Sequence, residues 1–208
     1  MLETLYRPNL REIPPYFKES VVLLRNLVRD RMIATWAPTT PWGARYVASK
    51  IPKPSFLGVE YGPGTGAVTR PLLDAMGSNG TLIALETNPN FVEHLKTIDD
   101  DRLHIHQASA EESEGILDGK KANFIVSGIP FSRGFLSPDT VDRIWRATMH
   151  TLDEHGVFIA YQVRNAVRRP LHRLFGNVQE ELYWWNMFPP LYIYRAQGKK
   201  PITESLAA

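Results

Sequence analysis

The sequence predicts an α/β fold with a seven-stranded, mostly parallel sheet whose last strand is antiparallel, preceded by an N-terminal amphipathic helix. Three observations lead to this prediction. From residue 56 onward, short apolar runs alternate with helical patterns, as in βαβ units. The first of these runs leads directly into a glycine-rich turn. The last two runs are separated only by NMFPP, which is too short for a helical crossover, so they must pair antiparallel.

The N-terminal region predicts an amphipathic helix over 16–33, because its apolar residues recur at spacings of three and four. The apolar stripe consists of Phe17, Val21, Leu24, Val28 and Met32. Lys18, Arg25 and Arg29 lie on another face. The prolines of TWAPTTPW end this region, and a second short helix is expected over 41–51. We divide the chain into 1–41, the helix and a loop facing substrate or membrane, a main domain over 42–196, and a polar tail over 197–208.

The main domain alternates strands and helices. The predicted strands cover 56–61, 81–86, 103–107, 123–129, 157–163, 178–185 and 191–196. Helices are expected over 68–76, after Asn88-Pro89 and after Ser137-Pro138, because each of these pairs supplies an N-cap and a proline for the first turn. A turn is expected over 153–156.

Composition narrows the function classes. The 208 residues include no cysteine, which excludes a disulfide scaffold, a thiolate metal site and a cysteine nucleophile. Lys plus Arg minus Asp plus Glu is 24 − 22 = +2, which does not indicate nucleic acid as a partner. No apolar run approaches the ~20 residues that span a bilayer, and the start lacks a signal-peptide layout, so we expect a cytoplasmic location. His104 and His106 share a strand face, but no third ligand is near in sequence, so no metal is predicted.

The turn EYGPGTG predicts a site for a nucleoside cofactor. Its glycines allow the backbone to approach a ligand closely. Glu86, twenty residues after Gly66, ends the second strand, where a carboxylate can accept hydrogen bonds from ribose hydroxyls. The cofactor-binding candidates from this region are Glu60, Tyr61, Gly62, Gly64, Thr65, Gly66, Glu86 and Thr87. The other interpretation is a purely structural glycine turn.

The motif E-x-G-P-G-T-G resembles the first motif of the Rossmann-like class I S-adenosylmethionine-dependent methyltransferases more than a dinucleotide fingerprint. This resemblance implies S-adenosyl-L-methionine as cofactor, with Glu60 facing its methionine amino group. Such enzymes often carry an aspartate toward the adenine amine after the third strand. Here Ser109 and Ala110 follow that strand, and Glu111 is an alternative acceptor.

Three further segments narrow the resemblance. They are Ser127 to Phe131 (SGIPF), APTT ending in Thr39 and Thr40, and NMFPP followed by Tyr194-Arg195. Together they resemble the bacterial phospholipid N-methyltransferases, which convert phosphatidylethanolamine stepwise toward phosphatidylcholine. This resemblance implies an anionic membrane surface and a phospholipid as partners, and a place at the inner face of the cytoplasmic membrane. Two positions depart from the pattern of that family: Ser109 stands where it has aspartate, and Phe188 is an additional residue before the proline pair.

The same resemblance assigns roles outside the glycine turn. The catalytic candidates are Ser127, Gly128, Ile129, Pro130 and Tyr16. Thr39, Thr40, Ser109 and Ala110 join the cofactor candidates. The candidates for substrate or membrane contact are Lys18, Arg25, Arg29, Tyr183, Trp185 and Arg195. For the 16–33 helix, the alternative is that it packs on the sheet with a solvated basic face.

Other functions share the expected fold. Ile129-Pro130-Phe131 is also similar to a motif of ribosomal RNA adenine dimethyltransferases, although Ser127-Gly128 stands where that family has its asparagine. The helical C-terminal domain of that family is also not expected here. A small-molecule methyltransferase and a cofactor-binding membrane-surface protein without activity are further alternatives. The number of methyl groups added and the oligomeric state stay open.

Overall fold

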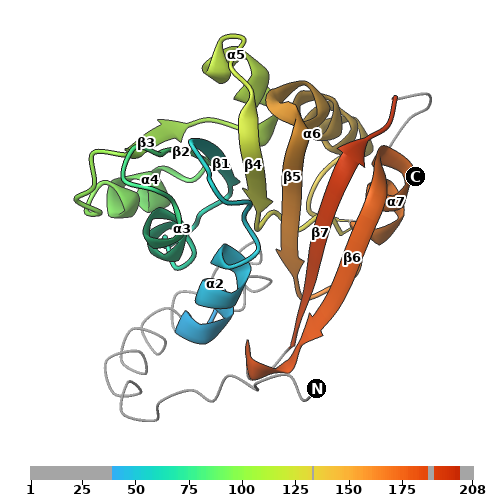
Figure 1. Cartoon of the computed structure of the whole chain (residues 1–208), viewed down its shortest axis with the longest axis horizontal. Coiled ribbons are helices and arrows are strands. Elements are labelled where there is room, and N and C mark those ends of the chain that lie inside the picture. Colours follow the sequence, from blue (N-terminus) through green and yellow to red (C-terminus); the bar gives the residue numbers. More distant parts are fainter. Residues whose placement is uncertain (1–38, 133, 187–189, 202–208) are drawn as a thin grey trace. The chain divides into compact units, whose positions relative to one another are not determined.

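The structure is a computed structural model that describes residues 39–132, 134–186 and 190–201 (Figure 1). In this part of the chain, seven strands form one sheet: β1 (Leu57–Tyr61), β2 (Thr81–Glu86), β3 (Leu103–Gln107), β4 (Ala122–Ser127), β5 (Leu152–Gln162), β6 (Phe175–Tyr183) and β7 (Leu191–Lys199). Their order across the sheet is β3-β2-β1-β4-β5-β7-β6. The strands from β3 to β5 are parallel, whereas β7 is antiparallel to both β5 and β6. The predicted fold class is confirmed.

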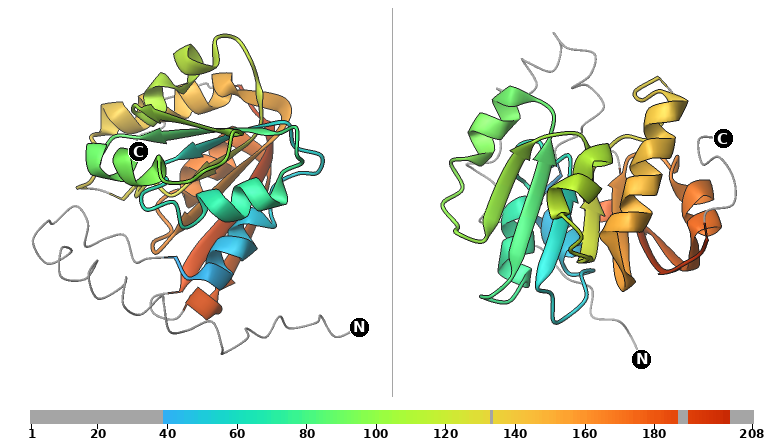
Figure 2. Two further views of the ribbon diagram at one scale, coloured as in Figure 1. Left: turned by 90° about the vertical axis from the view of Figure 1, so that its left-hand side faces the viewer. Right: turned by 90° about the horizontal axis from the view of Figure 1, so that it is seen from above.

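Helices cover both faces of this sheet (Figure 2). On one face lie α2 (Pro41–Ala48), α3 (Thr69–Ala75) and α4 (Pro89–Leu95), and on the other α5 (Ser113–Leu117), α6 (Pro138–Thr151) and α7 (Arg168–Leu174). Side chains alternate between the two cores: Phe124 and Val126 pack toward α3, while Ile125 packs toward α6. Since a parallel sheet is buried on both sides, its central strands read as nearly continuous apolar runs.

The two predicted helix starts are confirmed by their caps. The Asn88 side chain accepts a hydrogen bond from the Asn90 amide at 2.9 Å, and the Ser137 hydroxyl accepts one from the Thr140 amide at 3.1 Å. In both helices a proline follows the cap in the first turn, where its missing N–H costs nothing.

Several element boundaries differ from the prediction. β5 begins at Leu152 and includes the expected turn over 153–156, with a shift in its register to β4 between Ala122 and Phe124. β6 begins at Phe175, and the Trp184 and Trp185 expected in that strand form a 3-10 turn, η4 (Trp184–Asn186). β7 continues to Lys199, so the predicted polar tail from 197 begins too early.

The helical segment between β3 and β4 was not predicted. A short 3-10 helix, η3 (Ala110–Glu112), leads into α5 between β3 and β4. Its sequence signal is a capping box, in which the Ser109 hydroxyl accepts from the Glu111 amide at 3.4 Å and Glu112 Oε1 accepts from the Ser109 amide at 2.7 Å.

The predicted amphipathic helix over 16–33 lies outside the described residues, and with it Tyr16, Lys18, Arg25 and Arg29. Among the helices that the structure describes, none is both long and apolar enough to cross a bilayer.

Candidate cofactor and substrate site

The glycine-rich turn connects the carboxyl end of β1 to α3. Gly62, Gly64 and Gly66 have positive φ angles of 66°, 57° and 76°, which only glycine adopts without strain. The Gly62 amide donates to the Leu85 carbonyl at 2.9 Å, which ties the turn to the neighbouring end of β2. The turn therefore presents bare backbone at the carboxyl edge of the sheet, where α/β folds of this kind bind ligands.

Glu86, the last residue of β2, holds this turn in place. Its Oε2 accepts a hydrogen bond from the Gly64 amide at 3.0 Å, and its Oε1 accepts one from the Asn88 amide at 2.8 Å. The side chain is 5% exposed. Each carboxylate oxygen keeps a second lone pair, so a ribose hydroxyl can still donate to it. Spacing alone predicted this position for a ribose-binding carboxylate, but it did not predict that Glu86 also closes the turn.

Glu60 is fully buried one residue before the end of β1. Its Oε2 accepts from the Thr69 hydroxyl at 2.7 Å, whereas its Oε1 is buried with no hydrogen-bond partner among the described residues. Burial raises the pKa of Glu60 to about 8; the Thr69 hydrogen bond opposes this rise and the negative charge of Glu86 adds to it. A buried oxygen without a partner is a strong acceptor for a cationic donor. The amino group that the sequence analysis placed beside Glu60 fits this requirement.

The carboxyl end of β4 lies beside the glycine turn. The Gly128 amide donates to the Tyr61 carbonyl at 3.0 Å, so the chain after β4 continues along the end of β1. Ser127 is buried, while Gly128, Ile129 and Pro130 are half-buried. The Gln162 side chain donates to the Ile129 carbonyl at 2.5 Å, which fixes this segment to the end of β5. The structure thus places the predicted substrate segment against the predicted cofactor turn.

Other predicted cofactor residues have structural tasks in this chain. The Tyr61 hydroxyl lies in the core, 2.8 Å from the Ser113 hydroxyl, so only the Tyr61 backbone faces the turn. The Thr40 hydroxyl caps α2 by accepting from the Gly43 amide at 3.1 Å. Thr39 is buried just ahead of α2, and Ala110 is buried in η3. Of the remaining candidates, Thr87 is exposed and Thr65 is half-buried.

The two side chains expected after β3 as acceptors for the adenine amine form hydrogen bonds or ion pairs within the protein. The Ser109 hydroxyl belongs to the capping box of η3. Glu111, the alternative acceptor, pairs with Arg143 of α6 at 2.6 Å.

The predicted substrate and membrane residues near the end of the chain lie beside α2. The Tyr183 ring stacks on the Tyr46 ring, with centroids 4.5 Å apart. Arg195 Nε donates to the Lys50 carbonyl at 3.1 Å, which connects β7 to the end of α2. Trp184 and Trp185 in η4 are 65% and 51% exposed. Tyr183 therefore contacts α2, Arg195 contacts the segment just after α2, and the two tryptophans are exposed to solvent.

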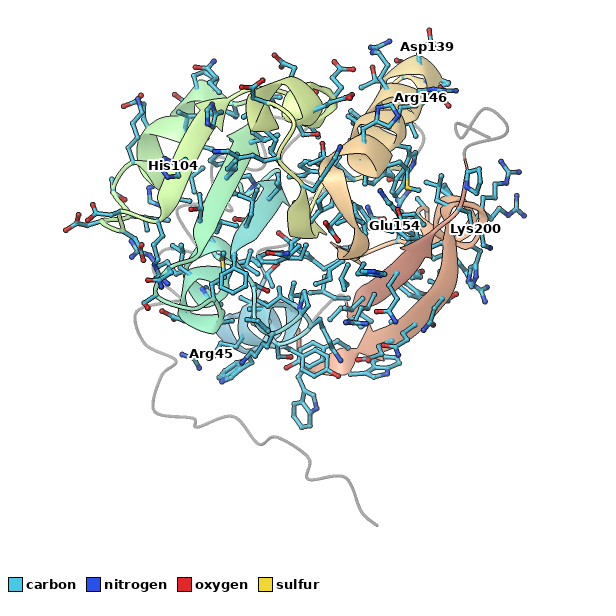
Figure 3. All side chains as sticks on the ribbon, turned by 45° about the horizontal axis from the view of Figure 1, so that its top comes forward. Arg45, His104, Asp139, Arg146, Glu154 and Lys200 are labelled. Carbon is cyan, nitrogen blue, oxygen red and sulfur yellow. The ribbon has the colours of Figure 1, made fainter. Side chains whose placement is uncertain are left out.

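Metal ligands do not gather in the part of the chain that the structure describes. Figure 3 shows His104 on the edge strand β3, and no group of three or more His, Asp or Glu side chains that could hold a metal ion occurs among the described residues.

Comparisons with known proteins agree with this architecture. No family model matches the chain. A S-adenosylmethionine-dependent O-methyltransferase from Thermotoga maritima superposes with a TM-score of 0.60 at 16% identity, covering 80% of this chain and 68% of the other. A putative methyltransferase from Streptococcus mutans, solved with S-adenosylhomocysteine, gives 0.56 at 12% identity, with 76% and 98% covered. The chain has the class I methyltransferase fold. At these sequence identities, the superpositions show the fold.

Two curated relatives indicate different substrates. An ornithine lipid N-methyltransferase from Singulisphaera acidiphila is 26% identical over 175 residues, which are 81% of this chain and 90% of that protein. A ribosomal RNA small subunit methyltransferase A from Herminiimonas arsenicoxydans is 28% identical over 138 residues, which are 64% of this chain and 51% of that protein.

Sequence reasoning missed two polar groups of this methyltransferase-fold site. Thr69, on the first turn of α3, supplies the hydrogen bond to Glu60, and its signal is the hydroxyl three residues after the glycine turn. Tyr161 of β5 lies against Gly128, but within an apolar strand it is indistinguishable from a core residue.

Proposed function

We propose that this protein is an N-methyltransferase for an amino lipid, phosphatidylethanolamine or a similar headgroup such as that of an ornithine lipid, at a membrane surface. The observation that carries the proposal is the similarity to an ornithine lipid N-methyltransferase, which extends over 81% of this chain and 90% of that relative. The ribosomal RNA relative matches a smaller share of both chains.

The residues of the site suit methyl transfer to an amine. Glu60 Oε1 and the Glu86 carboxylate offer acceptors for the amino and ribose groups of S-adenosylmethionine, and the glycine turn lets that molecule lie close to the backbone. When bound, the cofactor supplies an activated methyl group, so the protein has mainly to align the acceptor nitrogen. We propose that the backbone of Gly128 to Pro130, which is half-buried beside the glycine turn, contacts that acceptor.

Exposed aromatic residues after the edge strand β6 suit a lipid interface. Trp184 and Trp185 expose large aromatic rings at the carboxyl end of β6, and tryptophan is enriched where proteins meet the headgroup region. We propose that these rings and the basic residues Lys18, Arg25 and Arg29 bring the protein to an anionic membrane as a peripheral protein. Each basic residue near such a surface contributes about 1 kcal/mol. The double variant Arg25→Glu, Arg29→Glu should therefore lose affinity for anionic vesicles and keep its cofactor affinity, and unchanged vesicle sedimentation would contradict this role.

A ribosomal RNA adenine methyltransferase is the second candidate, because a ribosomal RNA methyltransferase is 28% identical over 138 residues and Ile129-Pro130-Phe131 is similar to a motif of the adenine dimethyltransferases. Against it, Ser127-Gly128 stands where that family has its asparagine, and a net charge of +2 gives little attraction to phosphates.

The deciding experiment is mass spectrometry after incubation with S-adenosylmethionine. One arm contains vesicles of phosphatidylethanolamine or ornithine lipid mixed with an anionic lipid, and the other contains ribosomal small-subunit RNA. Lipid products heavier by one, two or three methylene units support the proposal. Methylated adenine in the RNA arm, with unmodified lipids, would overturn it.

A further inference from the structure

The hydroxyl of Tyr161 lies where the cofactor turn and the substrate segment meet. β4 and β5 pair with Ser127 opposite Ala160, so Tyr161 lies level with Gly128. A Cβ added to Gly128 would be 2.5 Å from the Tyr161 hydroxyl oxygen and 3.3 Å from the Gly62 carbonyl oxygen. The phenol therefore lies directly over the Gly128 backbone, close to the glycine turn, and only glycine at position 128 allows this approach.

The side chain of Tyr161 is buried, but its hydroxyl oxygen is not fully enclosed: the fully buried side-chain atoms without a partner in the described residues are Glu60 Oε1, Trp145 Nε1 and the Tyr194 hydroxyl. Tyr161 is 9% exposed, and within the described residues its oxygen makes no recorded hydrogen bond. By comparison, the neighbouring Gln162 side chain is bonded to the Ile129 carbonyl. Because this oxygen keeps free hydrogen-bonding capacity beside the glycine turn, a ligand group that binds there can donate a hydrogen bond to it.

The surroundings keep the phenol neutral. Burial raises the pKa of Tyr161 well above 10, and the negative charges of Glu60 and Glu86 raise it further. A neutral phenol can accept a hydrogen bond through its lone pairs. It cannot be the group that removes a proton from the acceptor, because it is already protonated.

We propose that the Tyr161 hydroxyl accepts a hydrogen bond from an N–H of the acceptor amine and thereby directs the nitrogen lone pair toward the methyl group. The inference rests on the proposed amino-lipid function and identifies a substrate-binding residue of that site. In the step it assists, the nitrogen lone pair forms the new N–C bond, the electrons of the broken C–S bond stay on sulfur, and the surplus proton of the ammonium product passes to water.

This role predicts a dependence on the methylation state of the substrate. A neutral primary amine carries two N–H bonds and a monomethylated amine carries one, so both can donate to Tyr161. A dimethylated amine carries none. Loss of the hydroxyl should therefore slow the first two methyl transfers and spare the third, whereas loss of packing would slow all three.

The test compares Tyr161→Phe with wild type on vesicles of phosphatidylethanolamine and its N-methyl and N,N-dimethyl derivatives, at saturating S-adenosylmethionine, by mass spectrometry of initial rates. Tyr194→Phe is the matched control, because Tyr194 is another buried tyrosine whose hydroxyl has no partner among the described residues, and it belongs to the opposite core. We expect rates about five- to tenfold lower on the first two lipids, as for the loss of one neutral hydrogen bond, and less than twofold lower on the third. Calorimetry should give the same cofactor affinity for all three proteins.

Three results would overturn the inference. They are equal slowing on all three lipids, no slowing on any, and a parallel loss of cofactor affinity in Tyr161→Phe, which would assign the hydroxyl to the cofactor. If wild type methylates none of the lipids, the proposed function fails and this inference fails with it. Should Tyr161→Phe unfold at a lower temperature than Tyr194→Phe, Tyr161→Met repeats the comparison, and it must show the same selectivity for the first two lipids.

Discussion

The buried carboxyl of Glu60 should make the stability of the protein fall as the pH rises. Its pKa is about 8 in the folded chain and 4.5 for an unperturbed glutamate. Between these values the folded state holds a proton that the unfolded state releases, so the folded state binds more protons. The stabilisation is complete below pH 4.5 and is lost as the pH rises toward 8. Substitution by glutamine removes the titration while keeping the shape of the side chain.

The size of the effect follows from the shift. One pKa unit corresponds to 1.36 kcal/mol, and integrating between pH 5 and pH 8 gives a change of about 3 kcal/mol in the free energy of unfolding of wild type relative to Glu60→Gln. For a chain of this size, 1 kcal/mol moves the melting temperature by about 2–4 °C. Between pH 5 and pH 8, the melting temperature of Glu60→Gln should thus rise by roughly 6–12 °C relative to that of wild type.

Differential scanning calorimetry at pH 5, 6, 7 and 8 measures this difference directly. Glu93→Gln serves as the control, because Glu93 is an exposed glutamate on α4 paired only with Lys96 in the described structure, and its difference from wild type should stay flat. At pH 8, Glu60→Gln should be more stable than wild type and yet bind S-adenosylmethionine more weakly, since it lacks the carboxylate. A difference that stays constant within 1 kcal/mol from pH 5 to pH 8 would refute the reasoning.

Two further predictions concern the turn and the aromatic surface. Gly64→Asp should abolish cofactor binding in calorimetry, because it puts a second carboxylate beside Glu86 at a position with positive φ. The control Gly77→Asp should bind normally, because a Cβ added at Gly77 would meet nothing within 4 Å. Normal binding by Gly64→Asp would contradict the assigned site. The double variant Trp184→Ala, Trp185→Ala should bind phosphatidylethanolamine vesicles about tenfold more weakly with an unchanged melting temperature, because both rings are exposed. Sedimentation equal to wild type would exclude them from the membrane contact.

The parts of the fold that the sequence predicted well are those governed by local pattern. β1, β2 and β4 are buried on both faces and read as apolar runs, and the caps at Asn88 and Ser137 depend on adjacent residues. β6 is mostly exposed, so its apolar signal is weak, and its start at Phe175 was missed. The helix after β3 was missed because it is short, although its capping box is visible in the sequence.

In the candidate site too, the residues fixed by local spacing were predicted and the contact fixed by strand pairing was not. The glycine turn and Glu86 lie at a fixed spacing in a single βαβ unit, so the sequence located them. The contact between Tyr161 and Gly128 depends on how β5 aligns with β4, and the shift in register between these strands cannot be derived from either segment alone. Likewise, the family resemblance assigned Thr40 and Ser109 to the cofactor, and it did not show that their hydroxyls cap the starts of α2 and η3.

The place of β7 in the sheet has a consequence for biosynthesis. β7 follows β6 in sequence but lies between β5 and β6, so β6 has no sheet neighbour in the described structure until β7 is in place. A ribosome releases the chain from its N-terminus, and domains fold as their parts emerge. The strands from β1 to β5 can therefore assemble early, while β5 exposes an open hydrogen-bonding edge until residues 191–199 leave the ribosome. Pausing of translation just before this segment would prolong the stage at which the open edge of β5 can recruit a strand from another molecule.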